Sequence, residues 1–130
     1  MNYNYLIQIN GLPDYIGYSD DYFACMIVGE SMNKIIPNGS ICLFKKYRGG
    51  SRNGRIVLVQ SSGIQDYDFG SGYTIKEYQS KKSLNNDSWS HESITLIPQS
   101  FDNTFKKIEL MNEELEDFKV IGVFEKVLTY

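Results

Sequence analysis

The sequence predicts a mostly β fold, and three observations support this prediction. Short segments rich in Ile, Val, Tyr and Phe recur along the chain, as in proteins built from many short strands. Glycine and asparagine, which tolerate positive φ, separate these segments and supply the turns. Only one segment is a convincing helix candidate. We therefore expect a sheet protein with one short helix.

The predicted strands share β-branched and aromatic residues and are bounded by turn residues. In chain order, they cover Tyr5–Ile9, Tyr22–Val28, Ser40–Tyr47, Arg55–Gln60, Gly72–Gln79, Ser93–Ile97, Lys106–Leu110 and Phe118–Leu128.

The predicted helix begins at Ser31 and runs toward Ile36, where Pro37 ends it by biasing the preceding residue away from helix. Two further segments are expected to be irregular. Lys81–His91 is polar with a single large aromatic residue, and Met111–Asp117 is an acidic turn before the final strand.

The length and charge of the chain limit the classes of protein to which it can belong. The chain has 130 residues, 42% of them hydrophobic, which suits one domain with its own core. Its 13 basic and 16 acidic side chains give a net charge of -3, with no overall attraction to nucleic acid or to an anionic membrane. We find no apolar membrane span and no signal peptide, and we expect a cytoplasmic protein. Cys25 and Cys42 lie in apolar segments, which predicts buried reduced thiols, no metal site and no cofactor.

The most informative motif is Val28-Gly29-Glu30-Ser31-Met32, together with a single strand lysine, Lys76. A serine hydroxyl is a weak nucleophile at neutral pH, and an uncharged lysine amine can serve as its base. A lysine at its reference pKa of about 10.4 is almost fully protonated at pH 7. Lys76 would therefore need burial, which lowers the pKa of an amine. Taken separately, Ser31 fits an ordinary N-cap and Lys76 an exposed strand lysine.

Several motifs occur in the order seen in LexA/UmuD-like peptidase domains, and the chain resembles that family over roughly residues 22 to 128. The resemblance implies a lead-in segment over 1–21 and a mostly β peptidase domain over 22–130, with one short helix at the nucleophile. The motifs are Val28–Met32, Ile36–Ser40, Asn53–Val59, Tyr73–Lys76, Ile94–Pro98 and Phe118–Phe124.

By this resemblance, Ser31 is the nucleophile, Lys76 is the general base, and the backbone N–H groups of Glu30 and Ser31 form the oxyanion hole. Met32 would pack beneath the serine. The implied function is a regulatory serine peptidase domain that cleaves its own parent protein or a partner, in DNA-damage (SOS), phage or defence-related control. The implied partners are a second copy of the chain, paired through Phe118–Leu128, a protein substrate, and a RecA-type filament or a helicase or nuclease.

The chain departs from the family in ways that leave a second function open. It shows no N-terminal helix-turn-helix domain and no Ala-Gly or Cys-Gly pair, so autocleavage within the chain is not predicted. It is then a cleavage product, an excised domain or a stand-alone relative. The alternative function is a non-catalytic dimerisation or interaction module that docks on a helicase, polymerase or repressor. A membrane-anchored signal peptidase is excluded because Lys76 is not followed by that family's Pro-Gly-Asp segment.

Two other features are weaker candidates. His91 lies in the irregular segment, and we favour no catalytic role for it. A basic stretch suggests either a small phosphate-facing patch or a hairpin tip that keeps strand edges soluble, and the negative net charge favours the second. Its residues are Lys45, Lys46, Arg48, Arg52 and Arg55.

Overall fold

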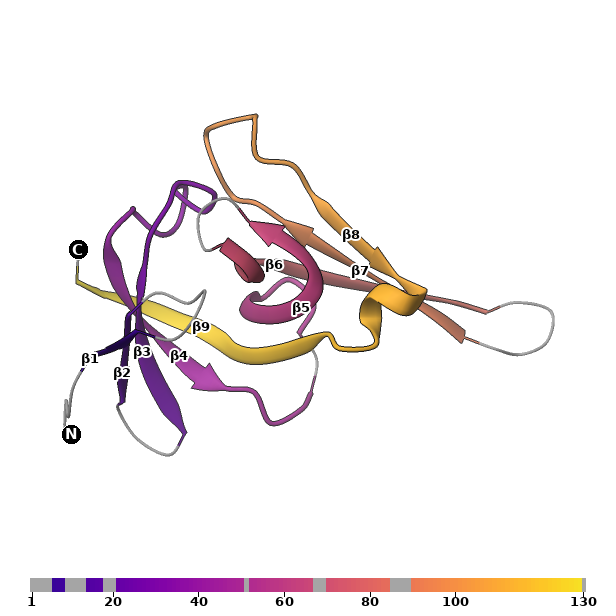
Figure 1. Cartoon of the computed structure of the whole chain (residues 1–130), viewed down its shortest axis with the longest axis horizontal. Helices are drawn as coiled ribbons and strands as arrows, with labels where there is room; N and C mark the ends of the chain where they lie inside the picture. The colour runs from indigo at the N-terminus through magenta and orange to yellow at the C-terminus, as the bar shows by residue number, and fades with distance from the viewer. Residues whose placement is uncertain are drawn as a thin grey trace.

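The chain folds into one antiparallel sheet, as a computed structural model of residues 6–8, 14–17, 21–50, 52–66, 70–84 and 90–129 shows. The sheet has 9 strands in the order β1-β2-β3-β4-β9-β5-β6-β7-β8 (Figure 1). The predicted mostly β class is confirmed. The elements are β1 Leu6–Gln8, β2 Asp14–Gly17, β3 Tyr22–Ile27, β4 Ser40–Lys46, β5 Ile56–Asp66, β6 Gly70–Leu84, β7 Ser90–Ile97, β8 Ile108–Met111, the 3-10 helix η1 Asn112–Leu115 and β9 Lys119–Thr129.

Strand β9 joins two groups of sequential strands. Strands β1 to β4 pair in chain order, and so do β5 to β8, whereas β9 lies between β4 and β5 (Figure 1). Val123 of β9, for example, is the partner of Lys45 on one edge and of Val57 on the other. Irregularities in both pairings let β9 fit between its two neighbours. The backbone of β9 therefore connects the two halves of the sheet.

The apolar side chains form two clusters on opposite faces of β5. Leu58 belongs to the first cluster, while its neighbours Val57 and Val59 belong to the second, as the alternation of side chains along a strand requires. Cys25 and Cys42 are buried in the first cluster and neither forms a disulfide with a described residue, which confirms the predicted burial of both thiols. Besides these, the first cluster contains Phe23, Ile27, Met32, Ile36, Phe44 and Ile75, and the second contains Ile64, Tyr78, Ile94, Leu96 and Leu110.

Gly122 of β9 permits a close approach between the strand and an aromatic pair. The rings of Phe23 and Phe44 stack with centroids 5.3 Å apart. A Cβ atom at Gly122 would lie 2.7 Å from Cζ of Phe23 and 3.3 Å from the carbonyl oxygen of Lys45. Only glycine fits this position without a shift of the ring, because the contact would be shorter than van der Waals distance.

The structure extends the prediction at two places. β2 was not predicted; it pairs with β3, so the described part of the lead-in segment continues the sheet. The prediction of an irregular segment over Lys81–His91 is wrong at both ends, because β6 continues to Leu84 and β7 begins at Ser90. Its polar composition is compatible with a hairpin that projects away from the core (Figure 1). Trp89 lies outside the described residues.

No helix within the described ranges is long and apolar enough to cross a membrane.

Candidate active site

Ser31 lies in a series of turns between β3 and β4, and the helix predicted from Ser31 to Ile36 is wrong. The N–H of Asn33 donates to the carbonyl of Glu30 at 3.3 Å, and the N–H of Ile36 donates to the carbonyl of Met32 at 2.7 Å. These bonds close single turns. They do not continue as a regular helix, because the packing of Ile36 and the bond from Ser100 to Glu30 fix a tighter path.

Two features of the sequence fix the direction of this turn. Gly29 has a φ of 117°, which lets the chain leave β3 at an angle that side-chain-bearing residues rarely adopt. Met32 is 2% exposed and Ile36 is fully buried, so both side chains anchor the turn in the first apolar cluster. Met32 is thus a packing residue, as predicted.

The loop after β7 holds the serine turn from the other side. The N–H of Lys34 donates to the carbonyl of Gln99 at 2.9 Å. The hydroxyl of Ser100 donates to the carbonyl of Glu30 at 2.8 Å. A residue 70 positions away in the chain therefore helps to fix the turn, and sequence reasoning did not detect this connection.

Lys76 lies on β6 and reaches the serine directly. Its Nζ atom is 3.0 Å from Oγ of Ser31, 2.6 Å from Oγ1 of Thr74 and 3.1 Å from the carbonyl oxygen of Ile75. Ser31 and Lys76 are each 3% exposed, and Thr74 is fully buried. The structure thus brings together the two side chains that the sequence pairs, in a site removed from bulk water.

The contacts of Nζ determine what this site can do chemically. A carbonyl oxygen only accepts hydrogen bonds, so Nζ donates to Ile75. A neutral amine has a second N–H for the hydroxyl oxygen of Thr74 and one lone pair, which can accept the proton of Ser31. Burial opposes the charge of an ammonium ion, whereas the three oxygen acceptors around Nζ favour it, so the site can hold either form of the amine. Thr74 had no assigned role in the sequence analysis, although strand alternation places it on the same face as Lys76.

The remaining predicted site residues lie in two places. The predicted oxyanion-hole donors, the N–H groups of Glu30 and Ser31, belong to the same turn as the serine hydroxyl, and their role stays a prediction. The backbone of His91 pairs with Ser83. At about 3.4 Å per residue, Ser83 lies about 24 Å along β6 from Lys76. The structure therefore does not bring the backbone of His91 to the serine–lysine pair.

The basic stretch makes local contacts rather than one continuous charged surface. Arg48 forms an ion pair with Asp21, with Nη2 and Oδ1 2.9 Å apart. The guanidinium group of Arg52 lies 4.9 Å from the ring centre of Tyr47 and 4.8 Å from that of Tyr78. Both contacts stabilise the loop between β4 and β5. Lys45 and Arg55 are exposed and Lys46 is half-buried, and nucleic-acid contact stays a prediction.

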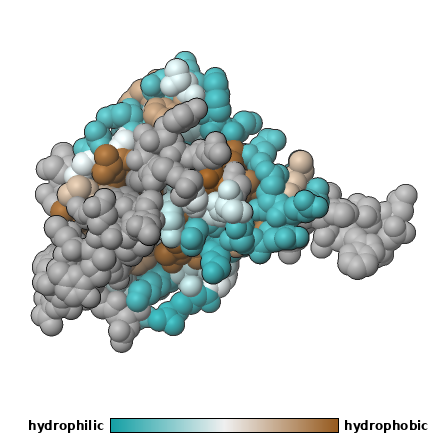
Figure 2. All heavy atoms as spheres, in the orientation of Figure 1, coloured by the Kyte–Doolittle hydropathy of each residue, from teal (hydrophilic) through white to brown (hydrophobic). Residues whose placement is uncertain are grey.

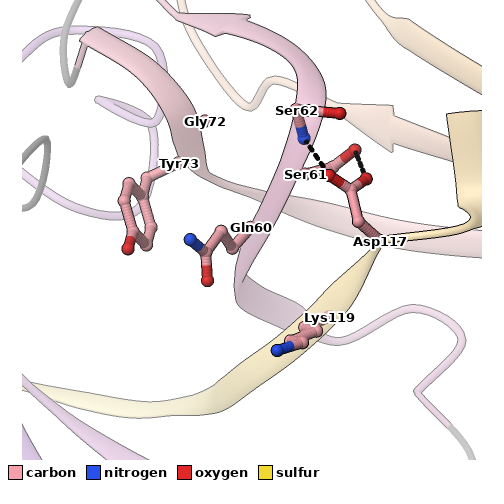
Figure 3. Close-up of a pocket in the computed structure, with 7 residues that line it drawn as sticks. All are labelled: Gln60, Ser61, Ser62, Gly72, Tyr73, Asp117 and Lys119. Carbon is pink, nitrogen blue, oxygen red and sulfur yellow. Dashed lines mark hydrogen bonds between the residues drawn. The ribbon is translucent and has the colours of Figure 1, made fainter.

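A polar pocket of about 240 Å³ lies where β5 and β9 stop pairing. Figure 3 shows Asp117 turned toward β5, where its carboxylate accepts bonds from the hydroxyl of Ser61 at 3.2 Å and the N–H of Ser62 at 3.0 Å. The bonds from Ser62 and Ser61 hold the pKa of this carboxyl below its usual range. Asp117 therefore anchors the predicted acidic turn, Met111–Asp117, to β5. The composition of the turn did not predict this role. The pocket is lined by Gln60, Ser61, Ser62, Gly72, Tyr73, Asp117 and Lys119.

Within the described residues, no group of three or more His, Cys, Asp or Glu side chains could hold a metal ion.

Comparison of the chain with protein-family models, curated proteins and solved structures finds no match. The functional argument therefore depends on the geometry of the serine–lysine pair.

Proposed function

We propose that the chain is a LexA/UmuD-like serine peptidase domain in which Ser31 and Lys76 form the catalytic pair. The observation that supports this proposal most directly is the 3.0 Å contact between Nζ and Oγ in a buried site. The function proposed is regulatory cleavage of a peptide bond in the parent protein or in a protein partner, in DNA-damage, phage or defence-related control.

The proposed reaction follows the order of events in serine peptidases. Nζ of Lys76 accepts the hydroxyl proton while Oγ of Ser31 attacks the carbonyl carbon of the substrate. Backbone N–H groups of Glu30 and Ser31 stabilise the negative oxygen of the tetrahedral intermediate. The resulting ammonium gives its proton to the leaving amine, and an acyl-enzyme on Ser31 remains. Lys76 then accepts a proton from a water molecule that attacks the ester, and it returns this proton to Oγ of Ser31 as the acid product leaves.

Thr74 is proposed as a positioning residue in this reaction. Its hydroxyl oxygen and the carbonyl of Ile75 lie within hydrogen-bond distance of Nζ. These two acceptors restrict rotation of the amine, so that the lone pair remains directed at the serine.

The burial of Ser31 has a consequence for substrates. At 3% exposure, its Oγ atom is reached by a peptide only after a local opening of the site. The same observation favours the second candidate function, a non-catalytic module that uses this fold to bind a helicase, polymerase or repressor, because a buried hydroxyl can also serve structure alone.

The two functions are distinguished by labelling with a fluorophosphonate followed by peptide mass mapping. If the chain is a peptidase, Ser31 is labelled, the rate rises with pH as the amine loses its proton, and Lys76→Ala abolishes labelling. Lys81→Ala is the matched control, because Lys81 is an exposed lysine on the same strand and should leave the rate unchanged.

Absence of labelling at every pH, with a folded protein, would contradict the peptidase proposal and leave the binding module. Labelling that persists in Lys76→Ala would also contradict the proposed base. Ser31→Ala serves as the blank for the mass measurement.

A further inference from the structure

β8 is the last strand at one end of the sheet, and its outer edge has no strand partner among the described residues (Figure 1). Its inner edge pairs with β7, with Leu110 opposite Ile94. An unpaired strand edge exposes backbone N–H and C=O groups that can pair with another chain. By contrast, β9 uses both of its edges for β4 and β5.

The charges around β8 are separated by sign along the chain. Lys106 and Lys107 precede the strand, and Glu113 and Glu114 follow it. All four side chains are exposed, and none forms an ion pair with another described residue. Figure 2 shows hydrophilic side chains over this end of the molecule. Glu109 within the strand is exposed as well, so the edge is basic before the strand and acidic from Glu109 onward.

From this separation of charge we infer that β8 pairs antiparallel with β8 of a second copy of the chain. In that arrangement, the basic end of each strand lies beside the acidic end of the other, across a two-fold axis. A parallel arrangement would place like charges together. Charged edges oppose most strand pairing, and here the order of signs favours the antiparallel arrangement over the parallel one.

The direction of the backbone groups indicates the register. The N–H of Met111 donates to Oε1 of Glu114 at 3.3 Å, so it points away from β7. Alternation along an antiparallel strand then turns Glu109 outward as well. Pairing Glu109 with Met111 of the second copy puts the axis at Leu110, and it turns the end that follows Lys107 toward the end that precedes Glu113 in the second copy.

Met111 adds an apolar contribution to this interface. Its side chain is 51% exposed, and it lies at the end of the strand where the second copy would cover it. On pairing, its N–H would exchange the bond to Glu114 for a carbonyl of the second copy, and Glu114 would become available to the opposite lysines. In this pairing, each copy adds a strand to the sheet of the other through the same edge. Both edges are then used, so the assembly stops at a dimer.

The test is sedimentation velocity over a range of concentrations, with two charge-reversed variants. Lys106→Glu with Lys107→Glu makes the whole edge acidic, and Glu113→Lys with Glu114→Lys makes it basic. Each variant alone should dissociate at least about tenfold more readily than the wild type, and an equimolar mixture should form a one-to-one dimer. High salt should weaken the wild-type dimer, because exposed charges are screened.

The matched control is Glu125→Lys with Lys126→Glu on β9, where both side chains are exposed. It keeps the net charge and should leave the dimer unchanged. A wild-type protein that is monomeric at all concentrations would overturn the inference. So would folded charge-reversed variants that dimerise like the wild type, or a mixture that stays monomeric. A dimer disturbed only by the β9 control would place the interface on β9.

Discussion

Replacing Thr74 by valine tests whether the surroundings of Nζ, and not only its proximity to serine, determine reactivity. Valine has nearly the same shape as threonine but lacks the hydroxyl oxygen that lies 2.6 Å from Nζ. Thr74 is fully buried, so water is poorly placed to replace the lost acceptor. The amine would keep its contact with the carbonyl of Ile75 and gain freedom to turn its lone pair away from Ser31.

The size of the effect follows from a single lost hydrogen bond. Such a bond contributes about 0.5–1.5 kcal/mol net. If that energy is lost in the transition state of acylation, the rate falls about two- to twelvefold. A fluorophosphonate should therefore label Ser31 of the Thr74→Val protein several times more slowly than Ser31 of the wild type. The labelling rate is measured at alkaline pH, where it no longer rises with pH.

Two companion variants make this result specific. Thr74→Ser retains the hydroxyl and should restore most of the rate. Thr95→Val makes the same change on the neighbouring strand β7 and should leave the rate unchanged. Wild-type labelling by a folded Thr74→Val protein would refute the positioning role of Thr74, and an equally slow Thr74→Ser would show that packing rather than the hydroxyl matters.

Two further predictions concern the core. Burial raises the pKa of Cys42 to about 12, whereas an unfolded thiol ionises near about 8.5. At pH 9, therefore, iodoacetamide should leave Cys42 unmodified in the folded protein and alkylate it in urea, and equal rates in the two states would contradict this burial. Gly122→Ala should lower the stability by about 1–3 kcal/mol, because its Cβ atom would lie 2.7 Å from Cζ of Phe23. Urea unfolding measures the loss, and the double variant with Phe23→Leu should recover part of it; an unchanged midpoint for Gly122→Ala would show that the ring moves without cost.

The sequence was informative where chemistry requires a particular residue type. Ser31 and Lys76 are distant in the chain, but the resemblance to LexA/UmuD-like domains and the need of a serine nucleophile for a base predict them as a pair. Strand positions were predictable because β-branched and aromatic residues mark them. Thr74 was not predicted as a functional residue, since threonine is common in strands and its contact with Nζ depends on the conformation of Lys76.

Other parts of the site depend on contacts that no local pattern encodes. The turn at Ser31 was predicted to be a helix because serine before a short apolar segment resembles an N-cap, whereas packing of Ile36 and the bond from Ser100 fix a tighter path. The hairpin end at Lys81 was predicted to be irregular because strand prediction relies on apolar alternation. Polar residues in such a hairpin are paired through their backbones, and backbone pairing cannot be predicted from the composition of the segment.

The place of β9 in the sheet also bears on the order in which the chain can assemble during synthesis. Ser31 belongs to the strands before β5 and Lys76 to those after β4, and the sheet joins the two groups through β9, which follows both in the chain. During synthesis, each group can begin to pair while β9 is still inside the ribosome. Ser31 and Lys76 would then lie in two groups of strands that no backbone pairing yet joins, and contacts such as the bond from Ser100 to Glu30 would be the first to hold them together.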